Sequence, residues 1–156
     1  INKYDNVLVV QTFSKSRSMA GIRLGYALGS ENIIEGLNRL KFSFNSYTID
    51  RISIEAGIES FKDDEYFEKT NAKIIQTREK TVEKLKKLGF KVLNSSANFI
   101  FISHNKVFAG DLYKQLKENG VLVRYFAKDR IDNYLRVTIG TDEEMEIFIE
   151  KLEEII

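Results

Sequence analysis

Lys15 stands between two serines in the polar run "TFSKSRSMAG", and Arg23 follows eight positions later. Residues 6–13, "NVLVVQTF", are an apolar and β-branched run typical of a strand buried on both faces, which places Lys15 at the carboxyl edge of a sheet. Burial lowers the pKa of a lysine amine and frees the amine as a nucleophile toward a carbonyl. The hydroxyls of Thr12 and Ser14 and the Arg23 guanidinium are donors suited to a phosphate. These residue types are compatible with a reactive amine beside a phosphate site, but by themselves they equally describe a solvated lysine in a turn, and that alternative stays open at this point.

Residues 12–29, "TFSKSRSMAGIRLGYALG", resemble the cofactor-lysine segment of the fold-type I aminotransferases, which depend on pyridoxal phosphate. The shared pattern is a hydroxyl residue, any residue, Ser-Lys, and then Ala-Gly-x-Arg-x-Gly-Tyr. The resemblance implies that Lys15 is the catalytic lysine and forms the Schiff base with pyridoxal 5'-phosphate. The implied ligands of the cofactor phosphate are Thr12, Ser14 and Arg23. Tyr26 completes the pattern, and we expect it to serve in packing.

Three further stretches resemble the histidinol-phosphate branch of this family, namely "SSANFIFI" (95–102), "GVLVRYF" (120–126) and "YLRVTIGTDEEM" (134–145). The resemblance implies that Arg136 binds the substrate carboxylate or phosphate and that Arg124 helps to bind the phosphate. A planar guanidinium suits either anion because it forms bidentate hydrogen bonds. A surface ion pair is the alternative for both arginines. Asn98 either lines the substrate site, as in relatives, or caps a turn.

The resemblance implies amino-group transfer between histidinol phosphate and 2-oxoglutarate, with glutamate as the other amino acid of the pair, in histidine biosynthesis. It covers only the C-terminal two-fifths or so of a family chain, and this chain opens on "INKYDNVLVV" without an initiator methionine. We therefore expect a piece of a longer enzyme that is inactive alone. Another member of the branch, an aromatic aminotransferase or a threonine-phosphate decarboxylase, is the nearest alternative.

The hydropathy pattern predicts an α/β chain in three parts. Residues 1–45 would be a truncated piece of a large cofactor-binding domain, residues 46–89 interdomain helices, and residues 90–156 a small α+β domain. The predicted strands are residues 6–13, 22–29, 90–93, 98–102, 121–126 and 134–140. The predicted helices follow Ser30, begin near Ile49, span 64–88 and 108–119, and follow Thr141.

Local signals predict where several of these elements begin and end. Ser30 is expected to cap a short helix, and the polar and aromatic residues 41–48 are expected to form a loop. Gly89 would end the long helix in a left-handed conformation. Thr141 and Glu144 have the spacing of a capping box.

The strands over 6–13 and 22–29 would leave valines and backbone groups uncovered without a partner sheet. We therefore expect residues 1–45 to pack against a second copy of the chain, which implies a homodimer, while residues 90–156 fold by themselves. The Lys15 pocket would then be open in this chain and would hold the cofactor weakly or not at all.

Composition argues against other classes of partner. The sequence has 24 basic and 23 acidic residues, so no charge surplus indicates nucleic acid or an anionic membrane. No run approaches the roughly 18 apolar residues of a membrane span. Cysteine is absent, which excludes thiol-bound metals and disulfides and agrees with a cytoplasmic protein. We expect no metal site, because His104 is the only histidine, and we expect that residue to be a solvated loop residue.

One alternative of another class is a non-catalytic binding module. Strands and helices alternate over residues 90–156 as they do in an RNA-recognition motif. Such a module needs exposed aromatic residues on one face of its sheet. In "NFIFI", Phe99 and Phe101 point to one face and Ile100 and Ile102 to the other, so we expect both faces to be covered.

Overall fold

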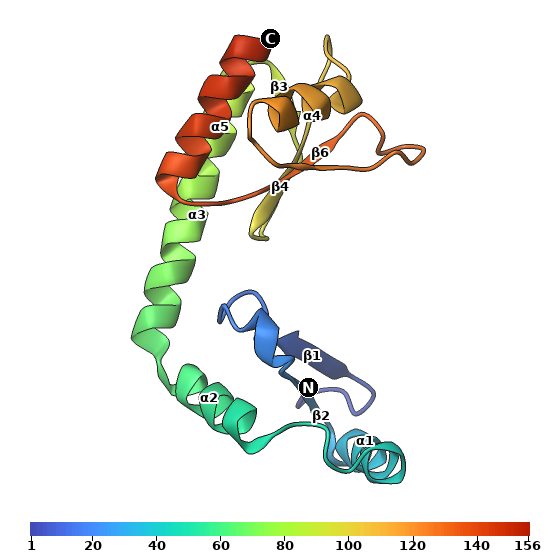
Figure 1. Ribbon diagram of the computed structural model, residues 1–156. Coiled ribbons are helices and arrows are strands. Elements are labelled where there is room, and N and C mark those ends of the chain that lie inside the picture. The colour runs from blue at the N-terminus through green and yellow to red at the C-terminus, as the bar shows by residue number, and fades with distance from the viewer. The chain divides into compact units, whose positions relative to one another are not determined.

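A computed structural model describes residues 1–156, which divide into two compact units, Ile1–Lys69 and Thr70–Ile156 (Figure 1). In chain order the elements are β1 (Leu8–Thr12), the 3₁₀ turn η1 (Ala20–Ile22), β2 (Gly25–Gly29), α1 (Glu31–Phe44), α2 (Arg51–Lys62), α3 (Asp64–Lys87), β3 (Phe90–Val92), β4 (Phe99–His104), α4 (Ala109–Glu118), β5 (Arg124–Tyr125), β6 (Leu135–Thr138) and α5 (Asp142–Ile155). The chain is a mixed α/β structure, as the sequence predicts. The division at residues 45 and 89 stays a prediction.

The first unit holds a two-stranded antiparallel ribbon of β1 and β2, whose register runs from Leu8 opposite Gly29 to Thr12 opposite Gly25. The first predicted strand is confirmed. The second is shorter than predicted, because η1 occupies its start and Arg23 has a left-handed backbone with φ 56°. Gly25 permits the close pairing, since a Cβ there would lie 2.8 Å from the carbonyl oxygen of Gln11.

The predicted burial of β1 on both faces is wrong for this chain. Every residue of β1 is exposed, with Val10 71% exposed and Leu28 of the neighbouring strand 45% exposed. The ribbon has only two strands, so each strand keeps one edge without a backbone partner. An apolar strand that is buried in a large sheet looks the same in sequence as one that lies in a small ribbon.

The helices α1 and α2 differ from the prediction in their ends. Ser30 precedes α1, but its hydroxyl donates to the carbonyl of Asp5 (2.8 Å) and caps no helix N–H. The helix continues to Phe44, so the predicted loop begins only after that residue, because neither glycine nor proline interrupts residues 37–44. Asp50 caps α2 by accepting from the Ser53 N–H (2.9 Å), and the hydrogen bonds from Ser53 lower the pKa of this carboxyl.

The second unit is built on a four-stranded antiparallel sheet in the order β3-β4-β6-β5. Buried residues of α3, α4 and α5 pack against buried residues of β4 and β6 and form the core, chiefly Leu85, Ile100, Ile102, Leu112, Leu116, Leu135, Phe148 and Leu152. Gly89, with φ 85°, ends α3 as predicted. The predicted strand 121–126 is wrong in length, because only Arg124 and Tyr125 pair with β6.

His104 is buried, which contradicts the predicted solvated loop residue. Only 8% of it is exposed, and its ring packs on Phe90 with the centroids 4.9 Å apart. A Cβ at position 89 would lie 3.2 Å from its Nε2, so Gly89 also makes room for the ring. The burial follows from the pairing of His104 with Phe90 at the end of β4.

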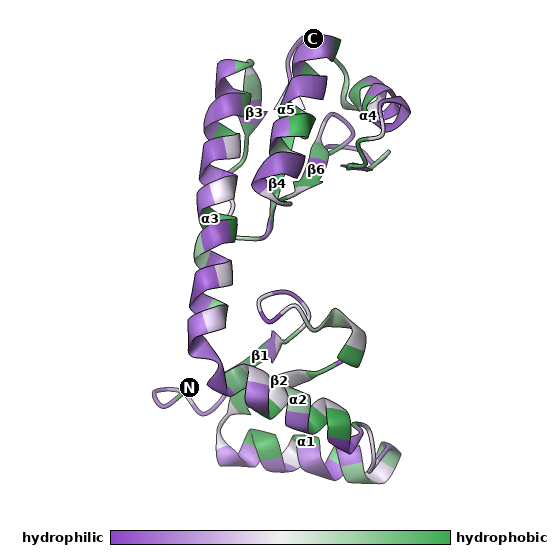
Figure 2. Ribbon diagram, turned by 60° about the vertical axis from the view of Figure 1, so that its left-hand side comes forward, coloured by the Kyte–Doolittle hydropathy of each residue, from purple (hydrophilic) through white to green (hydrophobic).

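The helices α3 and α5 lie side by side (Figures 1 and 2), and Figure 2 shows hydrophilic residues over most of α3. The predicted capping box of α5 is confirmed, since the Thr141 hydroxyl accepts from the Glu144 N–H and the Glu144 carboxylate from the Thr141 N–H. No helix combines the length and the apolar character that a membrane span requires.

Asp142 links α5 to α3 and makes the stability of the second unit depend on pH. It accepts from the Thr77 hydroxyl (2.6 Å) and lies 3.0 Å from Lys73 Nζ. The hydrogen bond from Thr77, followed by that from Lys73, lowers the pKa of Asp142 below its ordinary 3.8. A carboxyl whose pKa is lower in the folded state than in the unfolded state stabilises the folded state at any pH above its unfolded pKa. This contribution is lost as the pH falls through the folded-state pKa.

We therefore expect Asp142→Asn to lower the midpoint of thermal unfolding at neutral pH, and the difference from wild type to close on acidification below pH 3.8. The control is Asp129→Asn, because Asp129 lies in an exposed loop. This substitution should change neither the unfolding midpoint at neutral pH nor its dependence on pH. A difference that stays constant down to about pH 2 would show that the charge of Asp142 is irrelevant.

Candidate functional site

The turn after β1 presents Lys15 to solvent beside two hydroxyls. The Thr12 hydroxyl donates to Ser14 Oγ (2.7 Å) and accepts from the Ser14 N–H (3.0 Å), so these two side chains are fixed next to each other. Lys15 is exposed, and its side chain forms no hydrogen bond or ion pair. The Ser18 N–H donates to the carbonyl of Lys15 (3.0 Å) and closes the turn. The amine is therefore free, and the backbone that carries it is held.

Arg23 lies beside this turn in an unusual backbone conformation. The Phe13 N–H donates to the carbonyl of Leu24 (3.1 Å), which continues the ribbon beyond Thr12 and Gly25. Arg23 has φ 56° and ψ 36°, a left-handed geometry that costs a residue with a side chain on the order of 1–3 kcal/mol. Its guanidinium donates only to the carbonyl of Ala20 (3.0 Å), so most of its donors stay available.

Tyr26 serves in packing, as expected. Its ring meets Phe13 and Phe61 edge to face, with centroids 5.7 and 5.9 Å apart, and its hydroxyl donates to Gln11 Oε1 (2.6 Å). Phe13 is 6% exposed, so the residue directly before Ser14 anchors the turn in the first unit.

In the second unit, Arg124 and Arg136 are direct neighbours across β5 and β6. Both side chains are exposed, and neither forms an ion pair or a hydrogen bond. Two like charges at directly opposed positions destabilise a sheet, so this arrangement is unfavourable until an anion lies between them. The alternative interpretation of these arginines, in which each forms an ion pair on the surface, is wrong, because neither has an acidic partner.

Aromatic rings surround the two guanidinium groups. Arg136 lies over Phe99 (5.5 Å to the centroid) and Phe126 (5.9 Å), and Arg124 lies over Phe126 (5.3 Å). Phe101, which faces Arg136 across β4 and β6, stacks on Tyr134 with centroids 4.7 Å apart. The rings restrict the two arginines without neutralising them, which suits the binding of a planar or phosphorylated anion.

Asn98 is half-buried at the start of β4, where its carbonyl accepts from the Ile139 N–H (2.9 Å). Its side chain forms no hydrogen bond. The turn before it is held instead by Ser95, whose hydroxyl donates to the carbonyl of Phe99 (2.6 Å) and accepts from the Ala97 N–H (3.1 Å).

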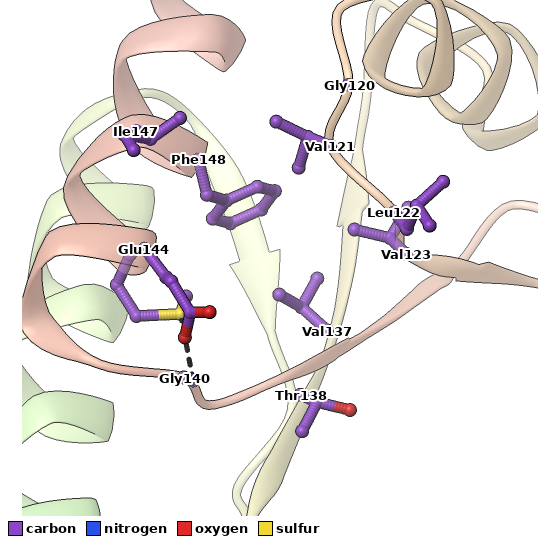
Figure 3. A pocket seen from close by; sticks show the side chains of 11 residues that line it. Gly120, Val121, Leu122, Val123, Val137, Thr138, Gly140, Glu144, Ile147 and Phe148 are labelled. Atoms are coloured by element: carbon purple, nitrogen blue, oxygen red, sulfur yellow. Dashed lines mark hydrogen bonds between the residues drawn. The ribbon is translucent and has the colours of Figure 1, made fainter.

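A cavity of about 500 Å³ in the second unit contains none of the predicted site residues. It lies between α5 and the segment after α4, and the side chains of Val121, Val137 and Phe148 point into it (Figure 3). At its edge the Gly140 N–H donates to Met145 Sδ (3.4 Å). Its lining is mostly apolar, with Thr138 and Glu144 as the polar side chains and no cation, so nothing links this cavity to the residues of the lysine motif.

The residues of the Lys15 turn fit an aldehyde that carries a phosphate. A free amine, two hydroxyls held 2.7 Å apart and an arginine with spare donors belong to one continuous stretch of chain. In the residues described here, no acidic side chain is bonded to Lys15 or Arg23, so no internal partner competes for a bound phosphate.

The fold and the sequence together place the chain in a family. Residues 1–152 match the model of aminotransferase class I and II, and the chain belongs to this family. The curated relatives include two enzymes named histidinol-phosphate aminotransferase. That of Brachyspira hyodysenteriae (strain ATCC 49526 / WA1) is 68% identical over 99% of this chain, and that of Clostridium botulinum (strain Okra / Type B1) 60% identical over all of it. The chain spans 44% of the length of either relative.

Solved structures agree on the fold. The histidinol-phosphate aminotransferase of Clostridium acetobutylicum superposes with a TM-score of 0.89, over 99% of this chain and 47% of that one, at 24% identity. A decarboxylase from Sulfurospirillum multivorans has a TM-score of 0.83, over 99% of this chain and 45% of that one, at 28% identity. The membership in an aminotransferase family outweighs the alternative of an RNA-binding module.

Two features of the candidate site are not predicted by the sequence. Phe126, which lies against both arginines, and Tyr134, which stacks on Phe101, stand in stretches that indicate only strands and loops. Arg17 lies inside the lysine motif, but nothing about its neighbours in sequence distinguishes it from a solvated arginine.

Proposed function

We propose that the whole protein to which this chain belongs is a histidinol-phosphate aminotransferase that uses pyridoxal 5'-phosphate. The observation that carries the proposal is the Lys15 turn, in which a free amine, two adjacent hydroxyls and a left-handed arginine follow the family motif. The names of relatives at 60–68% identity support the substrate. A role in histidine biosynthesis and a cytoplasmic location belong to the same proposal.

The cofactor would be held by the first unit. A solved histidinol-phosphate aminotransferase from Sinorhizobium meliloti, 23% identical to this chain, is in complex with pyridoxal-5'-phosphate. In the proposed site Thr12, Ser14 and Arg23 would bind the phosphate, and Lys15 would hold the cofactor covalently. When bound, pyridoxal phosphate supplies an electron sink for the bond that breaks at the substrate α-carbon.

Lys15 then acts on the substrate itself. With the cofactor bound, the amine at Lys15 Nζ would accept the proton from the substrate α-carbon and would return a proton later in the cycle. This role needs an amine without a permanent partner, and Lys15 has none.

Arg136 and Arg124 would bind the anionic end of the substrate. Their side chains stand at directly opposed positions on β5 and β6, and each lacks an acidic partner. A phosphate or carboxylate between them would relieve the repulsion of the two cations and accept their hydrogen bonds. Asn98 is proposed as a weaker substrate contact, because its side-chain amide is free of hydrogen bonds.

A decarboxylase of the same branch is the second candidate, because a decarboxylase from Sulfurospirillum multivorans is 28% identical and shares the fold. Purified full-length protein should be assayed against histidinol phosphate, phenylalanine and threonine phosphate, with 2-oxoglutarate as the amino acceptor. We expect glutamate to form fastest with histidinol phosphate. Release of carbon dioxide from threonine phosphate without glutamate formation would favour the decarboxylase instead.

We also propose that the whole protein is a homodimer. The first unit exposes large apolar side chains that a soluble surface rarely gathers, among them Val10, Leu40, Phe42, Phe44, Tyr47 and Ile52. Sedimentation of the full-length protein at about micromolar concentration is expected to show a dimer, since obligate dimer interfaces bury extensive apolar surface. A monomer under these conditions would contradict this part of the proposal.

A further inference from the structure

Arg17 is the most enclosed cation of the first unit, and it lies two positions after Lys15. Its side chain is 11% exposed, which is unusual for an arginine unless its charge is paired. One guanidinium nitrogen, Nη1, donates to the carbonyls of Ser60 and Asp63, the latter at 3.3 Å. The other, Nη2, lies 3.6 Å from the carboxylate of Asp64.

These partners all belong to the junction between α2 and α3. The last carbonyls of a helix lack partners within the helix and carry its partial negative charge, so a cation is favourable there. Arg17 supplies this cation to the end of α2 and pairs with Asp64, which opens α3. The guanidinium fork therefore bonds two helices at once, which a lysine amine does less well.

Aromatic rings hold the same guanidinium. Its central carbon lies 3.9 Å from the ring centroid of Phe67 on α3 and 5.3 Å from that of Phe61 on α2. Phe61 in turn meets Tyr26 of β2, and Tyr26 meets Phe13 at the end of β1. We call the bonds and ring contacts of Arg17 the Arg17 clamp.

The turn between Lys15 and Arg17 has few other supports. Two backbone hydrogen bonds hold it, from the Ser18 N–H to the carbonyl of Lys15 and from the Met19 N–H to the carbonyl of Phe13, both at 3.0 Å. Ser18 has a left-handed backbone with φ 56°, which is costly for serine. A strained turn of this kind persists only when the surrounding structure holds it, and the Arg17 clamp adds the side-chain contacts that join this turn to the α2–α3 junction.

We infer that Arg17 is a positioning residue for Lys15: it fixes the Ser-Lys-Ser turn to the α2–α3 junction and so presents the Lys15 amine in one orientation. The inference rests on the proposed role of Lys15 in cofactor attachment. It assigns Arg17 no contact with the cofactor or the substrate.

Two substitutions and one control test this inference in the full-length protein. Arg17→Met keeps an apolar stem against Phe61 and Phe67 but removes every donor. Arg17→Lys keeps the charge and loses the fork. The control is Arg39→Met, which removes an exposed arginine of α1 that pairs only with Glu35 (2.6 Å). Thermal unfolding of each variant establishes that it is folded.

The first measurement is hydrogen exchange of the cofactor-free protein. We expect Arg17→Met to speed the exchange of the Ser18 and Met19 amides by about tenfold or more, because the turn opens without its clamp, while amides of β6 and α5 are unchanged. Arg17→Lys should give an intermediate increase, and Arg39→Met none. Unchanged exchange at Ser18 and Met19, or an equal rise along the whole chain, would overturn the inference.

The second measurement is the rate at which added pyridoxal phosphate becomes trapped on Lys15 by borohydride. We expect Arg17→Met to slow this rate by about tenfold and Arg17→Lys by less, because the amine samples more orientations. An unchanged rate would overturn the positioning role. Wild-type protein that traps no cofactor would contradict the proposed function, and the exchange measurement would then still decide whether Arg17 holds the turn.

Discussion

Replacing Lys15 with alanine is expected to abolish transamination by the full-length protein, with a loss of about a thousandfold or more in kcat. The reason is that in the proposed function one amine serves two purposes: it would hold the cofactor, and it would move the proton at the substrate α-carbon. No other side chain in the turn can do either, since its remaining polar groups are hydroxyls and guanidinium groups. Transamination of histidinol phosphate with 2-oxoglutarate measures the loss.

Lys41→Ala is the matched control for this substitution. Lys41 is an exposed lysine of the same unit, 5.3 Å from the ring centroid of Phe42, and lies on α1 outside the motif. Its replacement should leave activity within about twofold of wild type. Lys15→Ala protein that keeps substantial activity, while remaining folded, would show that the amine of Lys15 is not the reactive group.

Arg136→Lys is expected to weaken substrate use far more than cofactor binding. Lysine keeps the charge but cannot form the bidentate hydrogen bonds of the guanidinium. Loss of one charged hydrogen bond costs about 1.5–3 kcal/mol, which corresponds to roughly tenfold to a hundredfold in kcat/KM. The affinity for pyridoxal phosphate should stay the same, because the proposed phosphate ligands belong to the motif around Lys15.

Arg130→Lys serves as the control for this second substitution, since Arg130 is exposed in the loop between β5 and β6 and forms no ion pair. It should change kcat/KM for neither substrate. If Arg136→Lys protein keeps its kcat/KM with histidinol phosphate and with glutamate, Arg136 does not belong to the substrate site.

Sequence predicts those parts of this structure that depend on local chemistry. Gly89 ends α3 because only a residue without a side chain takes its backbone conformation cheaply, and the Thr141 and Glu144 spacing fixes the start of α5. The apolar residues of α5 recur at helical spacing and reach the core, including Phe148 and Leu152. The lysine turn is recognised instead through its resemblance to a family motif, which is possible because that motif is continuous in sequence.

The features that sequence does not reveal depend on distant partners. Arg17 donates to the backbone carbonyls of Ser60 and Asp63. Every residue has a backbone carbonyl, so the sequence does not indicate which of them will accept this hydrogen bond. His104 is buried because β3 places Phe90 against it, which a loop-like stretch of polar residues does not indicate. The exposure of Val10 depends on which chain segments pair with β1. The apolar residues around Val10 are the same whether the strand is buried in a large sheet or exposed in a two-stranded ribbon.

The most direct test of the central claim is to map the covalent attachment of pyridoxal phosphate. Full-length protein is incubated with the cofactor, reduced with borohydride and digested, and the modified peptides are identified by mass spectrometry. The account predicts one modified lysine, Lys15, in the peptide that contains "TFSK", and no modification when histidinol phosphate is added before reduction. Modification of another lysine, or of none, would contradict it.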